Sequence, residues 1–351
     1  MIEDETTLDD LLTRPSQALI DFMGRLDGDL IVLGVAGKMG VSLAILAARA
    51  VEQTGVRKRV IGVARFSDES MQVQLEEHGV ETIRCDLLDR EAVAALPDAR
   101  NVIYMAGRKF GTGGQESLTW AMNVLVPANA AHRYRDSRIV AFSTGCVYPV
   151  VPAHGAGCTE DSAVGPIGEY AQSCLGRERV FEHAANVYGT PVCLIRLAYA
   201  IDLRYGVLHD IGDSIMRGGD VNLGSATFPC IWQGDANHQA LFCLEHTASP
   251  AVPLNVTGPK RLVTRDVATR MADLLEKPTA FPNEEGPLCY VVDATRAGGL
   301  FGPPRVSAEQ LIRWQAHWLK IGGRSLGKPT FDVARQPLPR GQPRLRRIAA
   351  C

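Results

Sequence analysis

Short apolar runs alternate with segments of helical periodicity from residue 30 to residue 195, and this alternation limits the possible folds more than any other feature. Each run is long enough for a buried strand, and each intervening segment is long enough for a helix. Strands that alternate with helices indicate βαβ units and a parallel sheet buried on both faces. The predicted strands are 30–33, 60–63, 82–84, 102–105, 139–142 and 192–195, and the predicted helices lie near 39–53, 69–78, 116–134 and 169–187.

The alternation ends near residue 200, where loops containing glycine and proline separate shorter elements. The sequence therefore predicts an α/β protein with a Rossmann-type, doubly wound parallel sheet and a smaller, irregular C-terminal substrate lobe. Later elements are predicted at 235–246, 264–275 and 307–319 (helices) and at 252–256, a strand that Pro253 confines to its start or to a sheet edge. The expected division is a helical N-terminal extension over 1–29, a Rossmann domain over 30–200 to which 235–256 returns, a lobe formed by 201–234 and 257–321, and a basic tail over 322–351.

Charge and cysteine usage exclude several classes of protein. The 351 residues include 37 Lys and Arg against 39 Asp and Glu, so no excess of positive charge indicates a nucleic acid or an anionic membrane as partner. No apolar run reaches the ~18 residues of a membrane span, and the first ten residues are acidic, unlike a secretion signal. Nine scattered cysteines without a C-x-x-C pair fit reduced thiols in the cytoplasm and no metal site.

Three glycines, Gly34, Gly37 and Gly40, follow the first predicted strand and precede the first predicted helix of the sheet. Glycine at such positions permits a tight turn, a close approach of backbone N–H groups to a pyrophosphate, and close packing of helix on strand. The N-terminus of the helix also attracts an anion. Although Gly37-Lys38 resembles part of a nucleotide triphosphatase loop, Met39 stands where that loop requires Ser or Thr. The loop therefore predicts a dinucleotide site.

The residue that follows the second strand usually selects the cofactor. An acidic residue there binds the ribose 2′-hydroxyl of NAD, whereas an arginine accommodates the 2′-phosphate of NADP. This chain has Ala64 at the acidic position and Arg65 directly after it. The sequence therefore favours NADP and leaves NAD open.

Five motifs in one order carry a resemblance to a known family. The glycine loop at 34–40 is followed by Asp86-Leu87, by Ala106-Gly107, by Ser143-Thr144 and by Tyr170 on the next helix. From about residue 30 to residue 235 the chain resembles the extended short-chain dehydrogenase/reductases, a family of NAD-dependent epimerases and dehydratases that act largely on nucleotide sugars. The segments 105–109 and 114–117 are similar to UDP-galactose 4-epimerases in particular.

The resemblance implies a role for each matching position. Thr144 would orient the substrate and Tyr170 would be the catalytic acid/base, because a phenol whose pKa is brought down from about 10 can exchange the proton that accompanies hydride transfer. Asn123 matches the helix asparagine that supports the site. The cofactor would contact Gly34, Gly37, Lys38, Met39, Gly40, Arg65, Asp86, Leu87, Ala106, Gly107 and Lys109.

Two departures from the family pattern stand out. The family has Y-x-x-x-K, but Cys174 occupies the lysine position four residues after Tyr170. In the family that lysine holds the nicotinamide ribose and lowers the tyrosine pKa by its charge, an effect of roughly 1–3 pKa units, and a neutral thiol does neither. A charge from Lys109 or Arg108, or a redox role of Cys174 itself, is left open. Tyr199 also replaces a substrate-facing asparagine after the sixth strand.

The sequence thus supports two functions. The first is an NAD(P)-dependent oxidoreductase, epimerase or dehydratase that acts on a nucleotide sugar or another small hydroxy or carbonyl compound through Tyr170 and Thr144. The second is a family member with impaired catalysis that binds NAD(P) and acts as a sensor or interaction protein. Both functions have a small-molecule ligand, neither needs a nucleic acid or a membrane, and a homodimer is left open.

Overall fold

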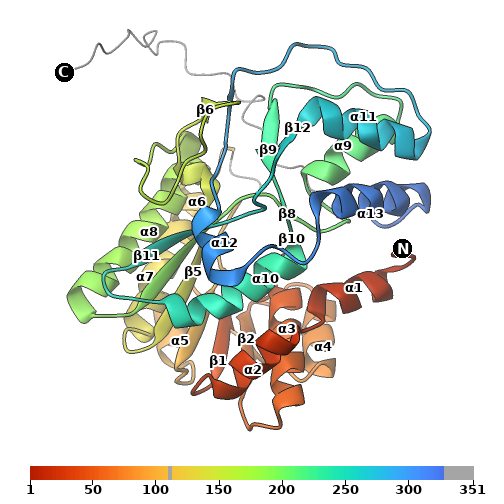
Figure 1. Ribbon diagram of the computed structural model, residues 1–351. Helices are drawn as coiled ribbons and strands as arrows, with labels where there is room; N and C mark the ends of the chain where they lie inside the picture. The colour runs from red at the N-terminus through yellow and green to blue at the C-terminus, as the bar shows by residue number, and fades with distance from the viewer. Residues whose placement is uncertain (110–112, 328–351) are drawn as a thin grey trace, which may run out of the picture.

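The computed structural model describes residues 1–109 and 113–327, and a seven-stranded sheet forms its centre (Figure 1). All neighbouring strands are parallel, which confirms the predicted Rossmann-type α/β class. Of the predicted basic tail, residues 328–351 lie outside the described residues. The strands of this sheet are β1 (Leu30–Leu33), β2 (Val60–Ala64), β3 (Glu81–Arg84), β4 (Asn101–Tyr104), β5 (Arg138–Thr144), β7 (Val192–Leu197) and β11 (Val252–Val256).

The strand order places the reversal of the winding next to β1. The order is β11-β7-β5-β4-β1-β2-β3, so β2 and β3 lie on one side of β1 and β4, β5, β7 and β11 lie on the other. Ligands of doubly wound sheets bind at the carboxyl ends of the strands at this reversal. Pro253 lies in β11, the edge strand, where its missing N–H is tolerated.

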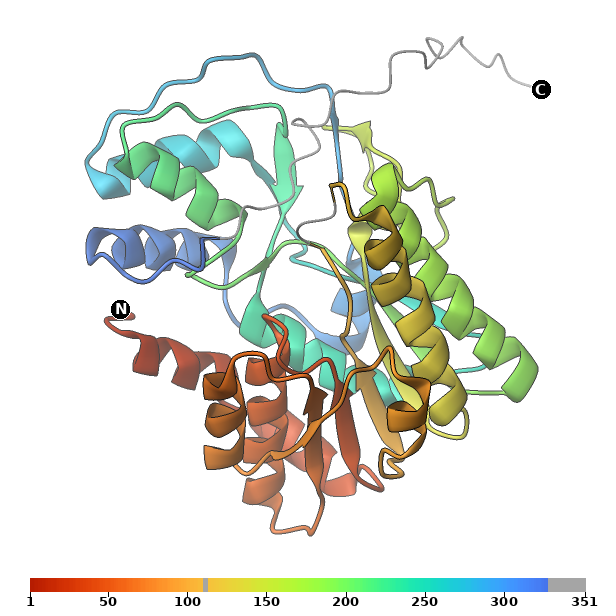
Figure 2. The same cartoon turned by 180° about the vertical axis from the view of Figure 1, so that it is seen from behind.

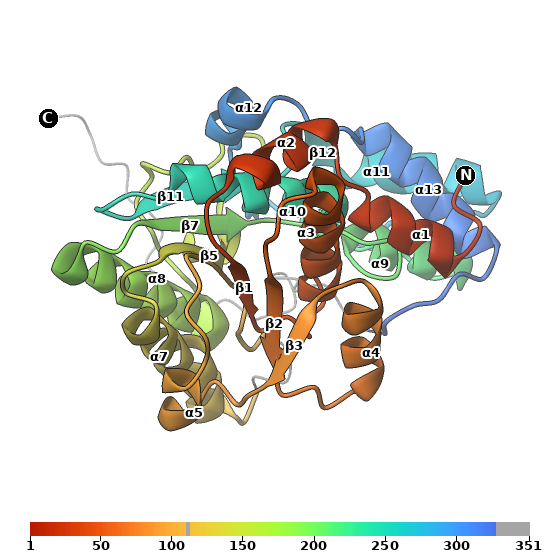
Figure 3. The ribbon, with the colours of Figure 1, turned by 90° about the horizontal axis from the view of Figure 1, so that it is seen from below.

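Helices cover both faces of the sheet (Figure 3). Successive residues of a strand point to opposite faces, and in β1 Leu30 and Val32 join one apolar core while Ile31 and Leu33 join the other. One face carries α2 (Gln17–Arg25), α3 (Gly40–Thr54), α10 (Gln233–Phe242) and α12 (Thr295–Phe301), the other carries α5 (Arg90–Ala94), α7 (Val126–Arg133) and α8 (Gly168–Tyr188), and α4 (Glu69–Glu77) lies beside β3.

The single helix predicted over 116–134 is interrupted. The segment consists of α6 (Glu116–Trp120), the π-helical turn η1 (Ala121–Leu125) and α7. Pro127 explains the wider turn, because a proline ring inside an α-helix collides with the carbonyl four residues earlier, here that of Asn123. The backbone instead bonds Val126 N–H to the carbonyl of Ala121, five residues back.

A second, smaller lobe lies above the carboxyl ends of the strands (Figures 1 and 2). Its core gathers apolar side chains from three helices that pack on one another, α9 (Val207–Met216), α11 (Thr264–Leu275) and α13 (Ala308–Lys320). The remaining elements are η2 (Gly145–Val147), β6 (Val151–Pro152), β8 (Ala200–Ile201), β9 (Thr227–Pro229), β10 (Ile231–Trp232), η3 (Cys243–His246), β12 (Arg261–Val263) and β13 (Leu288–Cys289).

The N-terminal segment contacts both parts of the molecule. Leu8 and Leu12 of α1 (Glu5–Thr13) are buried in the core of the lobe, whereas Phe22 of α2 is buried against the sheet. Glu5 and Asp9 of α1 form ion pairs with Arg204 at 3.4 and 2.9 Å. Within the described ranges, no helix combines the length and the apolar character needed to cross a membrane.

Candidate active site

A cavity of about 410 Å³ lies at the carboxyl ends of β1, β4, β5 and β7, where the sheet meets the smaller lobe. Its walls bring together many of the predicted site residues, namely Gly37, Lys38, Met39, Gly40, Gly107, Lys109, Thr144 and Tyr170. The remaining predicted residues do not line this cavity, namely Gly34, Arg65, Asp86, Leu87, Ala106, Asn123 and Cys174.

The glycine loop is shaped by close backbone contacts. Gly34 has φ +86°, and a β-carbon built on it would lie 2.6 Å from the backbone nitrogen of Ala106. A β-carbon on Gly40 would collide with the carbonyl oxygen of Val35. Gly37 differs, because the nearest atom to its β-carbon would be the Gly34 carbonyl oxygen at 3.2 Å. Gly34 and Gly40 are therefore required by the fold, whereas a side chain at Gly37 is restricted much less by the protein itself.

The electrostatics of the cavity suit an anion. Its described lining includes four cationic side chains, those of Lys38, Arg108, Lys109 and Arg177, and no carboxylate. The 15-residue helix α3 begins at the glycine loop, and no side chain caps its N-terminus. The N–H groups of the first turn and their partial positive charge therefore face the same loop as the Lys38 side chain.

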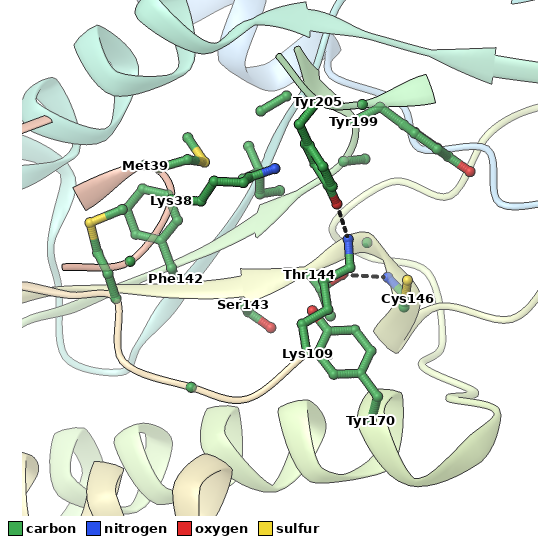
Figure 4. A pocket seen from close by; sticks show the side chains of 18 of the residues that line it. Lys38, Met39, Lys109, Phe142, Ser143, Thr144, Cys146, Tyr170, Tyr199 and Tyr205 are labelled. Atoms are coloured by element: carbon green, nitrogen blue, oxygen red, sulfur yellow. Dashed lines mark hydrogen bonds between the residues drawn. The ribbon is translucent and has the colours of Figure 1, made fainter. Parts of the chain in front are cut away.

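Thr144 and Tyr170 share one wall of the cavity (Figure 4). Thr144 ends β5, and its hydroxyl accepts a hydrogen bond from the backbone N–H of Cys146 at 3.2 Å. Tyr170 comes from the first turn of α8, and the nearby Thr144 hydroxyl acts to lower the pKa of its phenol. Removal of water from around the phenol, together with the nearby Cys174 and Cys146 thiols, raises the pKa of Tyr170 well above its ordinary value.

Cys174 lies one turn further along α8 and is 1% exposed. It packs in a small apolar cluster that includes Val147, Ala198 and Val292. Burial raises the pKa of its thiol, so Cys174 is neutral near pH 7 and supplies no positive charge beside Tyr170.

Asn123 lies behind the cavity wall, and its amide is fully engaged. Its oxygen accepts hydrogen bonds from the Arg108 backbone N–H at 2.8 Å and from Arg177 Nη2 at 2.7 Å. Its nitrogen donates to the carbonyl of Arg108 at 3.1 Å and to the hydroxyl of Ser173 at 2.9 Å. Asn123 therefore joins the loop that follows β4 to helix α8.

Arg65, Asp86 and Leu87 follow β2 and β3, on the opposite side of β1 from Thr144. Arg65 and Asp86 are exposed and Leu87 is buried. The Asp86 carboxylate accepts a hydrogen bond from the backbone N–H of Leu88 at 3.0 Å, which fixes the turn after β3.

Sequence reasoning missed Tyr205, which enters the cavity from the smaller lobe. Its hydroxyl accepts a hydrogen bond from Lys109 Nζ at 3.2 Å, and Lys38 Nζ lies 2.7 Å from the centre of its ring. Figure 4 shows Tyr205 across the cavity from Tyr170, with its hydroxyl directed towards Lys109. Little in the sequence indicated Tyr205. The only pointer was that Tyr205-Gly206 comes shortly after Tyr199, where the sequence departs from the family pattern.

A buried polar network supports the floor of the cavity. Ser143, which also lines the cavity, donates to Glu178 Oε1 at 2.5 Å, and Glu178 Oε2 lies 2.8 Å from Arg196 Nη2. Arg196 also donates to the hydroxyl of Tyr148 at 2.8 Å, and this hydroxyl donates to Asn255 Oδ1 at 2.8 Å. The network ties β5 to α8, β7 and β11.

The sequence also matches the model of a known protein family. Residues 30–201, just under half of the chain, match the model of the NAD-dependent epimerase/dehydratase family. The match ends near β8 and so includes the glycine loop, Thr144 and Tyr170. No curated protein matches the sequence.

Solved structures show the same fold at low sequence identity. The chain is similar to a dTDP-glucose 4,6-dehydratase from Bacillus anthracis in complex with NAD (TM-score 0.69, 15% identity, 84% of this chain and 97% of that one). It is also similar to a variant UDP-glucuronic acid 4-epimerase from Bacillus cereus in complex with NAD and a fluorinated sugar nucleotide (TM-score 0.70, 16% identity, 83% of this chain and 99% of that one). A UDP-galactose 4-epimerase is similar with a TM-score of 0.65 and 19% identity, over 83% of this chain and 98% of that one.

Proposed function

We propose that the protein is an NAD(P)-dependent oxidoreductase of the epimerase or dehydratase type that acts on a nucleotide sugar. One observation carries the proposal: the side chains of Thr144 and Tyr170 line the same cavity as the glycine loop and the Lys38 side chain. An anion-binding loop at one end and a pair of hydroxyls at the other are what a dinucleotide and a reacting alcohol require.

The residues present fit a dinucleotide. Gly37 leaves room for a phosphate to approach the backbone, and the uncapped N-terminus of α3 supplies donors. Lys38 would pair with the pyrophosphate, Asp86 and Leu87 would border the adenine, and Arg65 would favour NADP by pairing with a 2′-phosphate. When bound, the nicotinamide accepts or donates the hydride.

The chain's own residues handle the proton. Removing a hydride from a carbon that carries a hydroxyl requires a base for the hydroxyl proton, and Tyr170 Oη would take that proton. Thr144 would hold the substrate oxygen in line with Tyr170 by a hydrogen bond, which reduces the number of unproductive poses. In the reverse direction Tyr170 returns the proton.

The substrate assignment comes from the family match and the structural neighbours. Those neighbours are a dTDP-glucose 4,6-dehydratase, a UDP-galactose 4-epimerase and an epimerase in complex with a UDP-glucuronic acid derivative. The cationic lining of the cavity is suited to a substrate that itself carries a diphosphate.

A second function, dinucleotide binding without efficient hydride transfer, is favoured by one specific observation. Cys174 is neutral and the pKa of Tyr170 is raised, so only a small fraction of the phenol would be ionised and able to act as a base near pH 7. Such a protein would act as an NAD(P) sensor or as an interaction partner.

One experiment separates the two functions. The protein is incubated with NADP⁺ or NAD⁺ and with UDP-glucose, UDP-galactose, UDP-glucuronic acid or dTDP-glucose, and absorbance at the nicotinamide band and the masses of the products are followed. Conversion that disappears in Tyr170→Phe supports the enzyme, whereas cofactor binding without any conversion supports the second function. Arg65→Ala should weaken NADP⁺ binding and leave NAD⁺ binding unchanged, and equal loss for both cofactors contradicts the assignment of Arg65.

A further inference from the structure

The loss of the motif lysine raises the question of which group supplies positive charge near Tyr170. Tyr170, Cys174 and Arg177 are spaced i, i+4 and i+7 along α8, so they lie on one face of this helix. Cys174 is neutral, and Arg177 is the next residue on that face.

Arg177 is a buried cation that lines the cavity, although it is only 6% exposed. Nη1 donates to the carbonyl oxygen of Phe142 at 2.8 Å, and Nη2 donates to Asn123 Oδ1 at 2.7 Å. Its buried Nε has no hydrogen-bond partner, and it forms no ion pair with a carboxylate, among the residues that the structure describes. A guanidinium held in this way keeps its charge. The neighbouring Glu178 carboxylate helps to raise the pKa of Arg177, but it forms its direct ion pair with Arg196.

The guanidinium lies directly beneath the loop that follows β4. A β-carbon built on Gly107 would collide with Arg177 Nη2, so the absence of a side chain at Gly107 lets the guanidinium approach the cavity surface. Its central carbon also lies 5.8 Å from the centre of the Tyr104 ring, which covers it from the sheet side. Gly107 and Arg177 both line the cavity that contains Tyr170.

We propose that Arg177 is a positioning residue that replaces the missing lysine, supplying from beneath Gly107 the fixed positive charge that stabilises the ionised form of Tyr170. The proposal rests on the proposed function, in which Tyr170 exchanges the proton. It differs from the family arrangement in its chemistry, because a guanidinium remains charged throughout the accessible pH range and takes no part in proton transfer.

The groups that face Tyr170 act in opposite directions. From α8, the Cys174 thiol raises the pKa of Tyr170 and Arg177 lowers it. From β5 and η2, the Thr144 side chain lowers this pKa and the Cys146 thiol raises it. Lys109 lies close enough to Cys146 to lower the pKa of its thiol. Arg177 is therefore the cation on α8 itself that offsets the effect of burial.

The test measures the ionisation of Tyr170 directly, so it needs no substrate. The full chain is labelled with ¹³Cζ-tyrosine, saturated with NADP⁺ and titrated upward from neutral pH by NMR, and Tyr170→Phe assigns the signal. The variants are Arg177→Met, Arg177→Lys, Cys174→Lys and the double variant Arg177→Met/Cys174→Lys, with circular dichroism to confirm that each is folded.

We expect Arg177→Met to raise the midpoint of the Tyr170 signal by about 1–3 pH units, the usual effect of losing a nearby cation. Arg177→Lys should titrate close to wild type, and the double variant should return towards the wild-type midpoint. Cys174→Lys alone should lower the Tyr170 midpoint by less than the same substitution does in the Arg177→Met variant.

Two outcomes would overturn the proposal. One is an equal Tyr170 midpoint in wild type and Arg177→Met, or no Tyr170 titration in either of them before unfolding. The other, which does not require Arg177→Met to fold, is a full drop of about 1–3 units for Cys174→Lys in the otherwise wild-type chain. Failure of every nucleotide sugar to react would count against the proposed function and leave these midpoints unaffected.

Discussion

Glu178 of α8 and Arg196 of β7 form an ion pair with both side chains at most 5% exposed, and their closest atoms are 2.8 Å apart. Two further contacts from Arg196 Nε to the same carboxylate, at 3.1 and 3.3 Å, make the pair bidentate. Because Ser143 also donates to Glu178, the pair fixes a residue of the cavity wall as well as the packing of α8 on the sheet.

Removal of one partner should be strongly destabilising. Arg196→Met leaves the Glu178 carboxylate buried without its counter-ion, which should lower the free energy of unfolding by about 3–5 kcal/mol. The exposed pair Arg179 and Glu182 on the same helix provides the control, and Arg179→Met should change stability by about 1 kcal/mol or less. Urea denaturation measures both, and similar losses in the two variants would show that the buried pair is not special.

The glycine loop predicts two different kinds of defect. Gly34→Ala forces an alanine into φ +86° and against Ala106, so we expect a lower melting temperature together with lost cofactor binding. Gly37→Val should leave the fold intact and abolish binding, because its side chain enters the space that the phosphate needs. Gly55→Ala, which has φ +68° and no atom within 4 Å of the added carbon, isolates the backbone penalty. Normal cofactor binding by folded Gly37→Val would place the phosphate elsewhere.

Catalysis should depend on pH in the direction set by Tyr170. Burial of the phenol raises its pKa, so the ionised base is a small fraction at neutral pH. The rate of substrate oxidation should therefore rise about tenfold for each pH unit above neutrality, for as long as the pH stays below that pKa. A pH–rate profile of kcat checks this, with Tyr170→Phe as the control. A rate that is flat from neutral pH upward would assign the proton transfer to another group.

His238 makes the attachment of the N-terminal segment sensitive to acid. Its Nε2 accepts a hydrogen bond from the backbone N–H of Ser16, the residue that caps α2, at 3.2 Å. Burial and, to a smaller extent, the Arg305 guanidinium lower the pKa of His238 to about 4. The unfolded chain takes up this proton near pH 6.5 and the folded chain does not, so stability is lost as the pH falls from about 6.5 towards 4.

Protonation of His238 in the unfolded chain should lower the free energy of unfolding by about 3 kcal/mol as the pH falls from about 6.5 to about 4. Urea denaturation of wild type and His238→Gln at several pH values separates it from the effect of the carboxylates, because only the difference between the two proteins is used. The wild-type protein should lose its advantage over the variant as the pH falls. A difference that stays constant from neutral pH to pH 4 would mean that the histidine is protonated in the fold.

The sequence predicted the fold well where the signals were local. The helix predicted at 264–275 and the strand predicted at 252–256 have the observed bounds, since periodicity and Pro253 mark them directly. Pro127 also marked the interruption of the predicted helix 116–134, but the periodic pattern hid it.

Long-range relationships explain what the sequence did not reveal. Arg177 reads as an ordinary surface residue of a helix, and its burial depends on Gly107 and Asn123, residues more than fifty positions away. Tyr205 reaches the cavity only because the smaller lobe folds back over the sheet, with Arg204 held by α1. The predicted roles of Arg65, Asp86 and Leu87 remain predictions.

The edge strand β11 sets the smallest piece of this chain that could exist independently. It pairs with β7 from Cys193 to Leu197, yet it lies some fifty residues beyond the end of the segment that matches the family. A polypeptide cut at residue 201 would present the apolar β7 as an open edge, and such edges recruit other chains. If recombination exchanged this part of the chain between related proteins, α10 and β11 would therefore have to be exchanged with it. The smaller lobe would then be transferred together with the sheet on which it packs.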